Sequence, residues 1–394
     1  MLRESDLIDK KIRAASYLVM LVFGMANGSI GPLLVPIADS FKLRIAEVGY
    51  PVVLNSMGFF SAGIFISFVW RVYRARFLLT FFSLFFLFSL LSMVFLHNSM
   101  EVILPLLFFI GLSGGVLHGS TNSLFSEVFV NSRARYLSIL LMFFGLGAVV
   151  GPLLVGIVLT YTVRWYLVYL FFGIITFPLP LFFGRRKLYR NIKSYVMKKD
   201  SNCLREKPVT SFLFWVIILA NFLAIGVQVA FYSWMPFFLA KERSLSPAVA
   251  SYSVSVFWLS IIGGRALFAR FFHKSDLYHS LILGTGGAAL FFVLSFISDR
   301  MILTVLFLIF SGLFFSFVSP GLRALGGNIF SKHIGFLTGV ITASGSFGSM
   351  FLPWLVGQIS QKIGVSGGVL IIPVFSGAIA IILAKLRYFS GVKA

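Results

Sequence analysis

Residues 109–122 read Phe109-Ile-Gly-Leu-Ser-Gly-Gly-Val-Leu-His118-Gly-Ser-Thr-Asn122. The stretch lies inside an apolar, glycine-rich run, 102–129, that is long enough for a helix to cross a bilayer. His118 and Asn122 are four residues apart, so they share one face of that helix. A polar side chain in hydrocarbon is costly unless it meets a partner or lines a wet cavity. The pair therefore predicts a binding site within a membrane span.

The composition predicts an all-α membrane protein. Hydrophobic residues make up 59% of the 394 residues and charged residues 11%, whereas soluble domains carry about 25% charged residues. The apolar runs are about 20 residues long, as spanning helices require.

The formal charge of +21 is explained by basic cytoplasmic loops rather than by nucleic-acid binding. A single cysteine, Cys203, excludes an intrachain disulfide, and the first apolar run is too long for a cleaved signal peptide.

Apolar runs separated by charged breaks predict twelve transmembrane helices. All but one of the breaks are short, and the exception divides the chain into an N-terminal six-helix bundle (1–184), a basic cytoplasmic linker (185–208) and a C-terminal six-helix bundle (209–394). The expected spans are 14–36, 48–69, 77–96, 102–129, 136–161, 165–184, 210–240, 248–269, 277–297, 301–328, 334–360 and 366–384. Most lysines and arginines fall on one side if the N-terminus is inside, which predicts that both termini are cytoplasmic.

The two halves repeat each other. Asn55 and Ser255 are 200 residues apart, as are Gly63 and Gly263. Residues 147–156 read Gly-x-x-x-Gly-Pro-Leu-Leu-Val-Gly, and residues 348–357, which are 201 further on, read Gly-x-x-x-Leu-Pro-Trp-Leu-Val-Gly. Six spans per half give both halves the same orientation. A parallel repeat of this kind predicts pseudo-symmetric bundles with a site between them near the midplane.

These residues resemble the major facilitator superfamily, and within it the fucose–proton symporter-like branch. The resemblance touches most of the chain and rests on Gly24-Met-Ala-Asn-Gly28-x-x-Gly31-Pro32, Gly115-Val-Leu-His118-x-x-x-Asn122, Phe144-Gly-Leu-Gly-Ala-Val-Val-Gly-Pro152, Gly226-Val-Gln228-Val-Ala-Phe-Tyr-Ser-Trp234-Met-Pro236 and Phe257-Trp258-x5-Gly264-Arg265. It implies the major facilitator fold and transport by alternating access.

This chain differs from the branch because other residues stand at positions where the branch usually has acidic residues. The branch usually has an acid four residues before the asparagine of the fourth span, where this chain has His118. Gln228 stands where seventh-span members often have glutamate, and Trp70 precedes the arginines where the superfamily usually keeps an aspartate. All twelve acids lie in loops or near span ends, so no carboxylate is expected to carry a proton at mid-membrane.

The candidate substrate-binding residues are polar or aromatic side chains within predicted spans. Amides both donate and accept hydrogen bonds, which suits a hydroxyl-rich ligand, and an unperturbed imidazole titrates near pH 6.5, which makes His118 the candidate for proton coupling. Each of these side chains has an alternative role in packing helices together, and Trp234 either stacks on a sugar or lies in the interfacial aromatic belt. The substrate-binding set is His118, Asn122, Asn27, Gln228, Tyr232 and Trp258.

Charged residues near the cytoplasmic span ends are candidates for an inner gate, and plain anchoring at the membrane surface is the alternative. The gate set is Arg71, Arg74, Glu127, Arg265 and Arg323.

Together these features predict a secondary active or facilitative transporter of a small polar organic solute, with a sugar as one candidate. An efflux carrier for apolar drugs or lipids, which the 48 phenylalanines would suit, and a non-transporting substrate sensor remain alternatives. No phosphate loop, metal-ligand spacing or catalytic set is present, so neither an enzyme nor a cofactor is expected. We expect a monomer in the bacterial inner membrane whose partners are the solute, the lipid bilayer and, if transport is coupled, protons.

Overall fold

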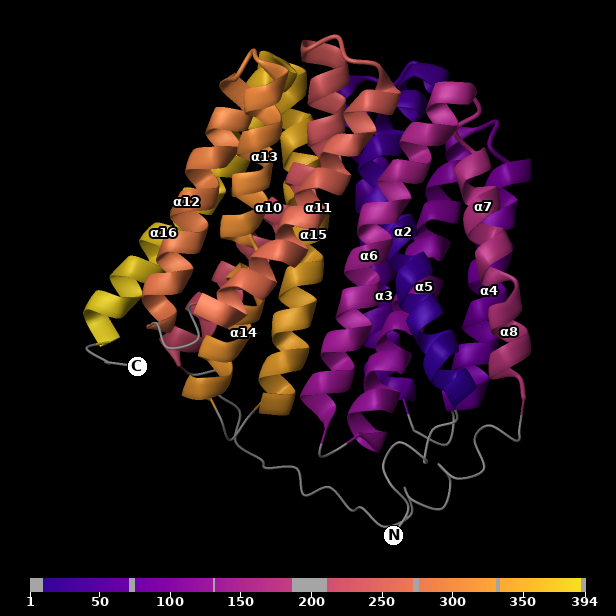
Figure 1. The fold of residues 1–394 in the computed structure, drawn as a ribbon, viewed down its shortest axis with the longest axis horizontal. Helices are drawn as coiled ribbons and strands as arrows, with labels where there is room; N and C mark the ends of the chain where they lie inside the picture. Colours follow the sequence, from indigo (N-terminus) through magenta and orange to yellow (C-terminus); the bar gives the residue numbers. More distant parts are fainter. Residues whose placement is uncertain are drawn as a thin grey trace. The chain divides into compact units, whose positions relative to one another are not determined.

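The computed structural model describes residues 10–70, 75–129, 132–185, 211–271, 276–330 and 334–390, and these residues form helices and no strand. The helices are α2 (Lys10–Phe41), η1 (Ile45–Glu47), α3 (Tyr50–Val69), α4 (Ala75–Phe95), α5 (Met100–Val128), α6 (Arg133–Tyr161), α7 (Leu167–Thr176), α8 (Pro178–Phe183), α10 (Phe212–Glu242), α11 (Pro247–Phe271), α12 (Leu277–Ile297), α13 (Met301–Phe315), α14 (Val318–Ile329), α15 (Ile334–Val369) and α16 (Ile371–Ser390) (Figure 1).

Eleven stretches of the described helices are long and apolar enough to cross a membrane. The segment predicted as the sixth span is a shorter apolar stretch, Leu167–Phe183, in which Phe177 separates α7 from α8. Pro178 begins α8 and has no N–H to donate to the carbonyl four residues earlier, so the helical hydrogen-bond pattern is interrupted there although Phe177 keeps helical dihedral angles.

The predicted span 301–328 is likewise two helices, α13 and α14, separated at Ser316–Phe317. Pro320 provides the physical reason. Its ring excludes a regular bond to the carbonyl of residue i−4, which is Ser316. The Ser316 hydroxyl turns back to the carbonyl of Leu313 at 2.7 Å. This break leaves a backbone carbonyl available inside the helix bundle.

The last two predicted spans meet at a kink that lies in the predicted break between residues 360 and 366. The range of α15 up to Val369 contains two helices joined across a kink at Gly364, which has φ +83° and ψ 163°, and α16 follows at once. Glycine is the residue that adopts a positive φ without strain, and it reverses the chain here without a separate loop.

The described chain divides into two compact units. Unit 1 contains residues up to Ile30 together with Leu54–Asn202, and unit 2 contains Gly31–Val53 together with Cys203–Ala394. The second part of α2 therefore groups with the C-terminal half of the chain. The predicted boundaries at 184 and 209 remain a sequence-based prediction.

Each unit contains the same close approach of two helices. A Cβ on Gly147 of α6 would lie 2.0 Å from the Leu21 carbonyl oxygen of α2, and a Cβ on Gly348 of α15 would lie 2.0 Å from the Phe222 carbonyl oxygen of α10. Leu21 and Phe222 are 201 residues apart, as are the two glycines. Only glycine permits this separation, so the repeated sequence corresponds to a repeated contact.

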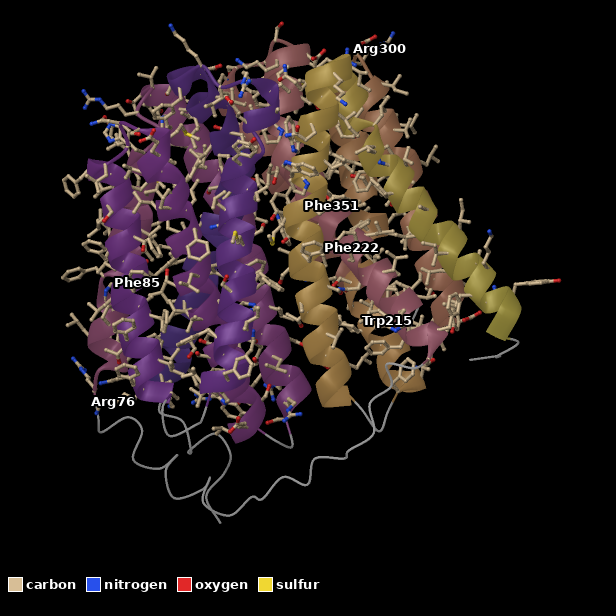
Figure 2. All side chains as sticks on the ribbon, turned by 180° about the vertical axis from the view of Figure 1, so that it is seen from behind. Arg76, Phe85, Trp215, Phe222, Arg300 and Phe351 are labelled. Atoms are coloured by element: carbon tan, nitrogen blue, oxygen red, sulfur yellow. The ribbon has the colours of Figure 1, made fainter. Side chains whose placement is uncertain are left out.

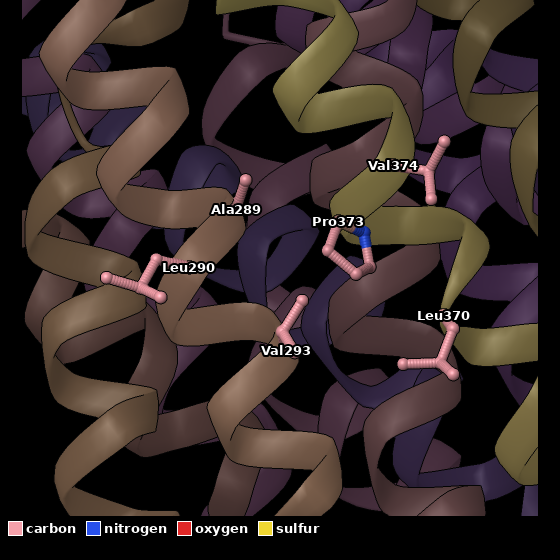
Figure 3. Close-up of a pocket in the computed structure, with 6 residues that line it drawn as sticks. All are labelled: Ala289, Leu290, Val293, Leu370, Pro373 and Val374. Carbon is pink, nitrogen blue, oxygen red and sulfur yellow. The ribbon is translucent and has the colours of Figure 1, made fainter.

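Aromatic side chains fill much of the space between the helices. In unit 2, Phe222 of α10 lies against Phe351 of α15 with ring centroids 5.9 Å apart (Figure 2). An open groove of about 410 Å³ runs between α12 and α16 and is lined by Ala289, Leu290, Val293, Leu370, Pro373 and Val374 (Figure 3). All six side chains are apolar, so the groove offers no hydrogen-bonding group to a hydrophilic solute.

Candidate functional site

His118 of α5 lies among three phenylalanine rings from three other helices of unit 1. Its ring centroid is 5.7 Å from that of Phe23 in α2, 5.8 Å from Phe59 in α3 and 6.0 Å from Phe144 in α6. We call these three rings the aromatic cage. The histidine is nevertheless only half-buried, so the cage holds the imidazole in place without sealing it.

The cage depends on glycine in α5. A Cβ on Gly114 would lie 2.3 Å from the ring of Phe23, and a Cβ on Gly115 would lie 3.0 Å from the ring of Phe59. The glycine-rich sequence before His118 therefore lets two aromatic rings approach the helix backbone. This packing fixes His118 relative to α2 and α3.

Asn122 is the polar neighbour of His118, as the four-residue spacing predicted. Its Nδ2 lies 3.3 Å from Nε2 of His118, and the amide is half-buried. An amide N–H can donate only to an unprotonated ring nitrogen. The same amide nitrogen lies 3.4 Å from Nδ1 of His118, so either ring nitrogen is within reach. An imidazole protonated on both nitrogens has no acceptor for this amide, which would then have to turn or move away.

Asn27 lies on α2, one helical turn beyond Phe23, and is half-buried. This spacing puts it on the same helix face as a ring of the aromatic cage. Unit 1 thus presents Asn27, His118 and Asn122 beside the cage.

Unit 2 contains the other three predicted binding residues. Tyr232 of α10 and Trp258 of α11 are in contact, with ring centroids 5.8 Å apart. Gln228 precedes Tyr232 by one turn of α10 and shares its face. All three side chains are more deeply buried than His118, with 8% of Gln228, 5% of Tyr232 and 6% of Trp258 exposed.

Trp234 has a structural role. It is fully buried, and its Nε1 donates to the carbonyl of Pro353 at 3.0 Å. It is therefore neither a stacking surface for a ligand nor a residue of an interfacial aromatic belt.

Two of the predicted gate residues, Arg71 and Arg74, lie outside the described residues. Glu127 accepts a hydrogen bond from Trp70 Nε1 at 2.7 Å. Arg265 Nε donates to the Ser316 carbonyl at 3.3 Å, and Arg323 is exposed. None of the four ion pairs found in the described part of the chain includes these residues, so the ionic gate stays a prediction.

Sequence reasoning missed the aromatic cage. With 48 phenylalanines in the chain, no single one stands out, although the four-residue spacing of Phe23 and Asn27 on one helix face was a usable signal. Among the described residues no group of three histidine, cysteine, aspartate or glutamate side chains is placed to hold a metal ion.

Comparison with known proteins extends this description. The family model described as "Major Facilitator Superfamily" matches residues 16–325. The protein TsgA homolog of Buchnera aphidicola is 22% identical over 380 residues, covering 96% of this chain and 95% of the relative. The glucose/mannose transporter GlcP of Bacillus subtilis is 25% identical over 360 residues, covering 87% and 86%. A crystal structure of a D-xylose–proton symporter shares the fold, with a TM-score of 0.73 at 15% identity, covering 95% of this chain and 97% of the symporter.

Proposed function

Because the chain belongs to the Major Facilitator Superfamily of membrane transporters, we propose that it is a secondary transporter that moves a small polar organic solute by alternating access. It is a multi-pass integral membrane protein, and its relatives are transporters rather than enzymes, as the sequence predicted. The bacterial relatives agree with the predicted inner-membrane location.

The proposed architecture is twelve spans in two six-helix bundles with both termini in the cytoplasm. Eleven apolar helices and the shorter Leu167–Phe183 segment support the number of spans. The matching contacts of Gly147 and Gly348 support the internal repeat. The excess of basic residues in one set of loops supports the orientation.

The observation that carries the proposed function is the half-buried His118–Asn122 pair beside the aromatic cage. An amide that both donates and accepts can hydrogen-bond sugar hydroxyls, and the cage supplies apolar surface for a sugar ring. Asn27 would extend the polar face, and Gln228, Tyr232 and Trp258 would supply the matching groups of the second bundle. The glucose/mannose and D-xylose transporters among the similar proteins support a sugar as the solute.

His118 is the proposed proton carrier if transport is coupled. The described acids lie at helix ends or in loops, so His118 is the titratable candidate within the described mid-span region. Protonation would displace the Asn122 N–H from the imidazole, which links the protonation state of the site to the amide that contacts the solute. Uncoupled, facilitative transport is the alternative.

Ligand-dependent thermal stabilisation of the purified full-length protein tests solute binding, because a ligand of the native state raises its stability. D-Glucose or D-xylose should raise the melting temperature. His118→Ala and Asn122→Ala should lose most of that rise, whereas the matched surface substitutions His279→Ala and Asn328→Ala should retain it. Normal binding in both site variants would contradict the proposed site.

Uptake into proteoliposomes tests the mechanism. Solute flux that is abolished by a proton uncoupler indicates coupling, and flux that survives it indicates a facilitator. Stabilisation only by lipophilic dyes would favour the efflux carrier, and stabilisation without flux would favour the sensor.

A further inference from the structure

Two arginines of unit 2, Arg265 of α11 and Arg323 of α14, form a cluster of positive charge within the helices. Each is six residues from the end of its helix, which corresponds to about 9 Å of helix rise. Arg265 contacts the carbonyl of Ser316 at the start of the break between α13 and α14, and Arg323 follows Ser316 by seven residues on α14. Two like charges on neighbouring membrane helices are unfavourable unless an anion or water compensates them.

The break between α13 and α14 determines how Arg265 is held. Pro320 frees the Ser316 carbonyl from its regular helix bond, and Arg265 Nε donates to that carbonyl at 3.3 Å. One turn further along α11, the ring of Phe268 stacks on Phe317, with centroids 3.5 Å apart. With Nε engaged, the two terminal nitrogens of Arg265 still carry four N–H donors in one plane.

No carboxylate in the described part of unit 2 neutralises this charge. The five described acids of this unit each have another partner: Asp39 pairs with Lys241, Glu47 with Arg44, Asp276 with Arg387, Asp299 with Arg243, and Glu242 accepts from Ser366.

The internal repeat relates Arg323 to the candidate site of unit 1. The helix caps Phe129 and Phe330 are 201 residues apart, have similar dihedral angles (φ −98° and ψ 60°; φ −113° and ψ 45°), and each donates its N–H to the carbonyl four residues earlier. The same offset places Arg323 at the position of Asn122. Unit 2 therefore has a guanidinium where unit 1 has the candidate binding amide.

The surroundings of both arginines are suited to a ligand. Gly327, one turn beyond Arg323, has no atom within 4 Å of where its Cβ would lie, so this face of α14 is open. Ser319, one turn before Arg323, adds a half-buried hydroxyl on the same face. On α11, Trp258 precedes Arg265 by two turns, so the arginine continues the face that carries a predicted binding residue.

We propose that Arg265 and Arg323 bind one oxyanion, a carboxylate or phosphate group carried by the transported solute. Guanidinium groups match such oxyanions in geometry and charge and bind them with paired, charge-assisted hydrogen bonds. The inference rests on the proposed function and narrows its solute to an anionic, hydroxyl-bearing compound. The other source of the same chemistry is the phosphate of a phospholipid headgroup.

Thermal stabilisation by matched probes tests the assignment on the full-length protein in detergent. D-Gluconate and D-glucose 6-phosphate should stabilise the protein more than D-glucose does at equal ionic strength. Arg265→Gln and Arg323→Gln should each weaken binding of the anionic probes about tenfold or more, since each removes a charge-assisted contact. The Lys variants, which keep the charge but lose the paired geometry, should fall between. Arg300→Gln, which removes one exposed charge from the opposite end of α13 (Figure 2), should bind them as the wild type does.

The possible results separate the inference from the proposed function. Stabilisation by D-glucose without any additional effect of the anionic group would overturn the inference and leave solute transport intact. Arginine-dependent stabilisation by phosphatidylglycerol but not by either anionic sugar would also overturn it, because the anion would then be a lipid. Binding of the anionic sugars that requires both arginines, but without flux in proteoliposomes, would support the site while contradicting transport.

Discussion

Trp234 of α10 and Pro353 of α15 are joined by a hydrogen bond from the indole Nε1 to the proline carbonyl, 3.0 Å long and fully buried. We predict that Trp234→Phe lowers the apparent melting temperature, because the buried hydrogen bond between α10 and α15 is lost. Hydrogen bonds between membrane helices contribute about 0.6–1.7 kcal/mol, so a shift of a few degrees is expected. Trp215→Phe, at an exposed position of the same helix (Figure 2), should change little, and equal shifts in the two variants would contradict the assignment.

The repeated glycine contacts predict that Gly→Ala lowers the stability of the protein at the contact positions, although the same substitution normally stabilises a helix. Gly→Ala normally favours a helix by about 1 kcal/mol. At Gly147 and Gly348 the added methyl would lie 2.0 Å from a backbone oxygen, so both substitutions should lower the melting temperature or prevent folding. Gly377→Ala, with nothing within 4 Å of its Cβ, should be neutral or stabilising. Thermal unfolding in detergent measures all three, and a stabilised Gly348→Ala variant would contradict the packing.

The helices and the repeat could be predicted from the sequence, because spanning helices appear as long apolar runs and the repeat appears as matching residues at a constant offset. It did not predict the break at Ser316–Phe317, since the hydropathy of Met301–Ile329 is high throughout and Pro320 alone does not indicate which carbonyl it frees. The contact of Asn122 with His118 followed from spacing along one helix. The aromatic cage and the contact of Tyr232 with Trp258 connect different helices, and pairings between helices are not visible in a single sequence.

The aromatic cage should matter for binding more than for folding. Replacing Phe23 with leucine removes the ring that contacts both His118 and Phe59, and such aromatic contacts contribute about 0.5–1.5 kcal/mol beyond burial. We therefore expect about a three- to tenfold loss of solute affinity, measured by ligand-dependent thermal shift. Phe88→Leu, at a ring that is 67% exposed, is the matched control. Unchanged affinity in Phe23→Leu would exclude the cage from the binding site.

The segment Gly31–Val53, which contains the end of α2 and η1 and groups with unit 2, makes polar contacts with α10 and α15. Lys241 forms an ion pair with Asp39, and the Ala46 N–H donates to Gln361 Oε1 at 3.1 Å. The ion pair lines a pocket of about 430 Å³. Both of its side chains are partly exposed, at 40% for Lys241 and 53% for Asp39, so the pair contributes about 1 kcal/mol or less to stability and weakens with salt. Removing it should barely change the melting temperature.

The same contact has a larger consequence for transport than for stability. Alternating access requires the proposed bundles to separate on each side in turn, so a covalent link at this position should stop the cycle. In a Cys203→Ser background, which removes the only native cysteine, the double substitution Asp39→Cys and Lys241→Cys should be cross-linked by a reducible bifunctional thiol reagent about as long as the lysine side chain, and the cross-link should abolish uptake into proteoliposomes. Reduction of the reagent should restore uptake, and either single substitution should transport normally after the same treatment. Full uptake by the cross-linked protein would mean that these two residues remain together throughout the transport cycle.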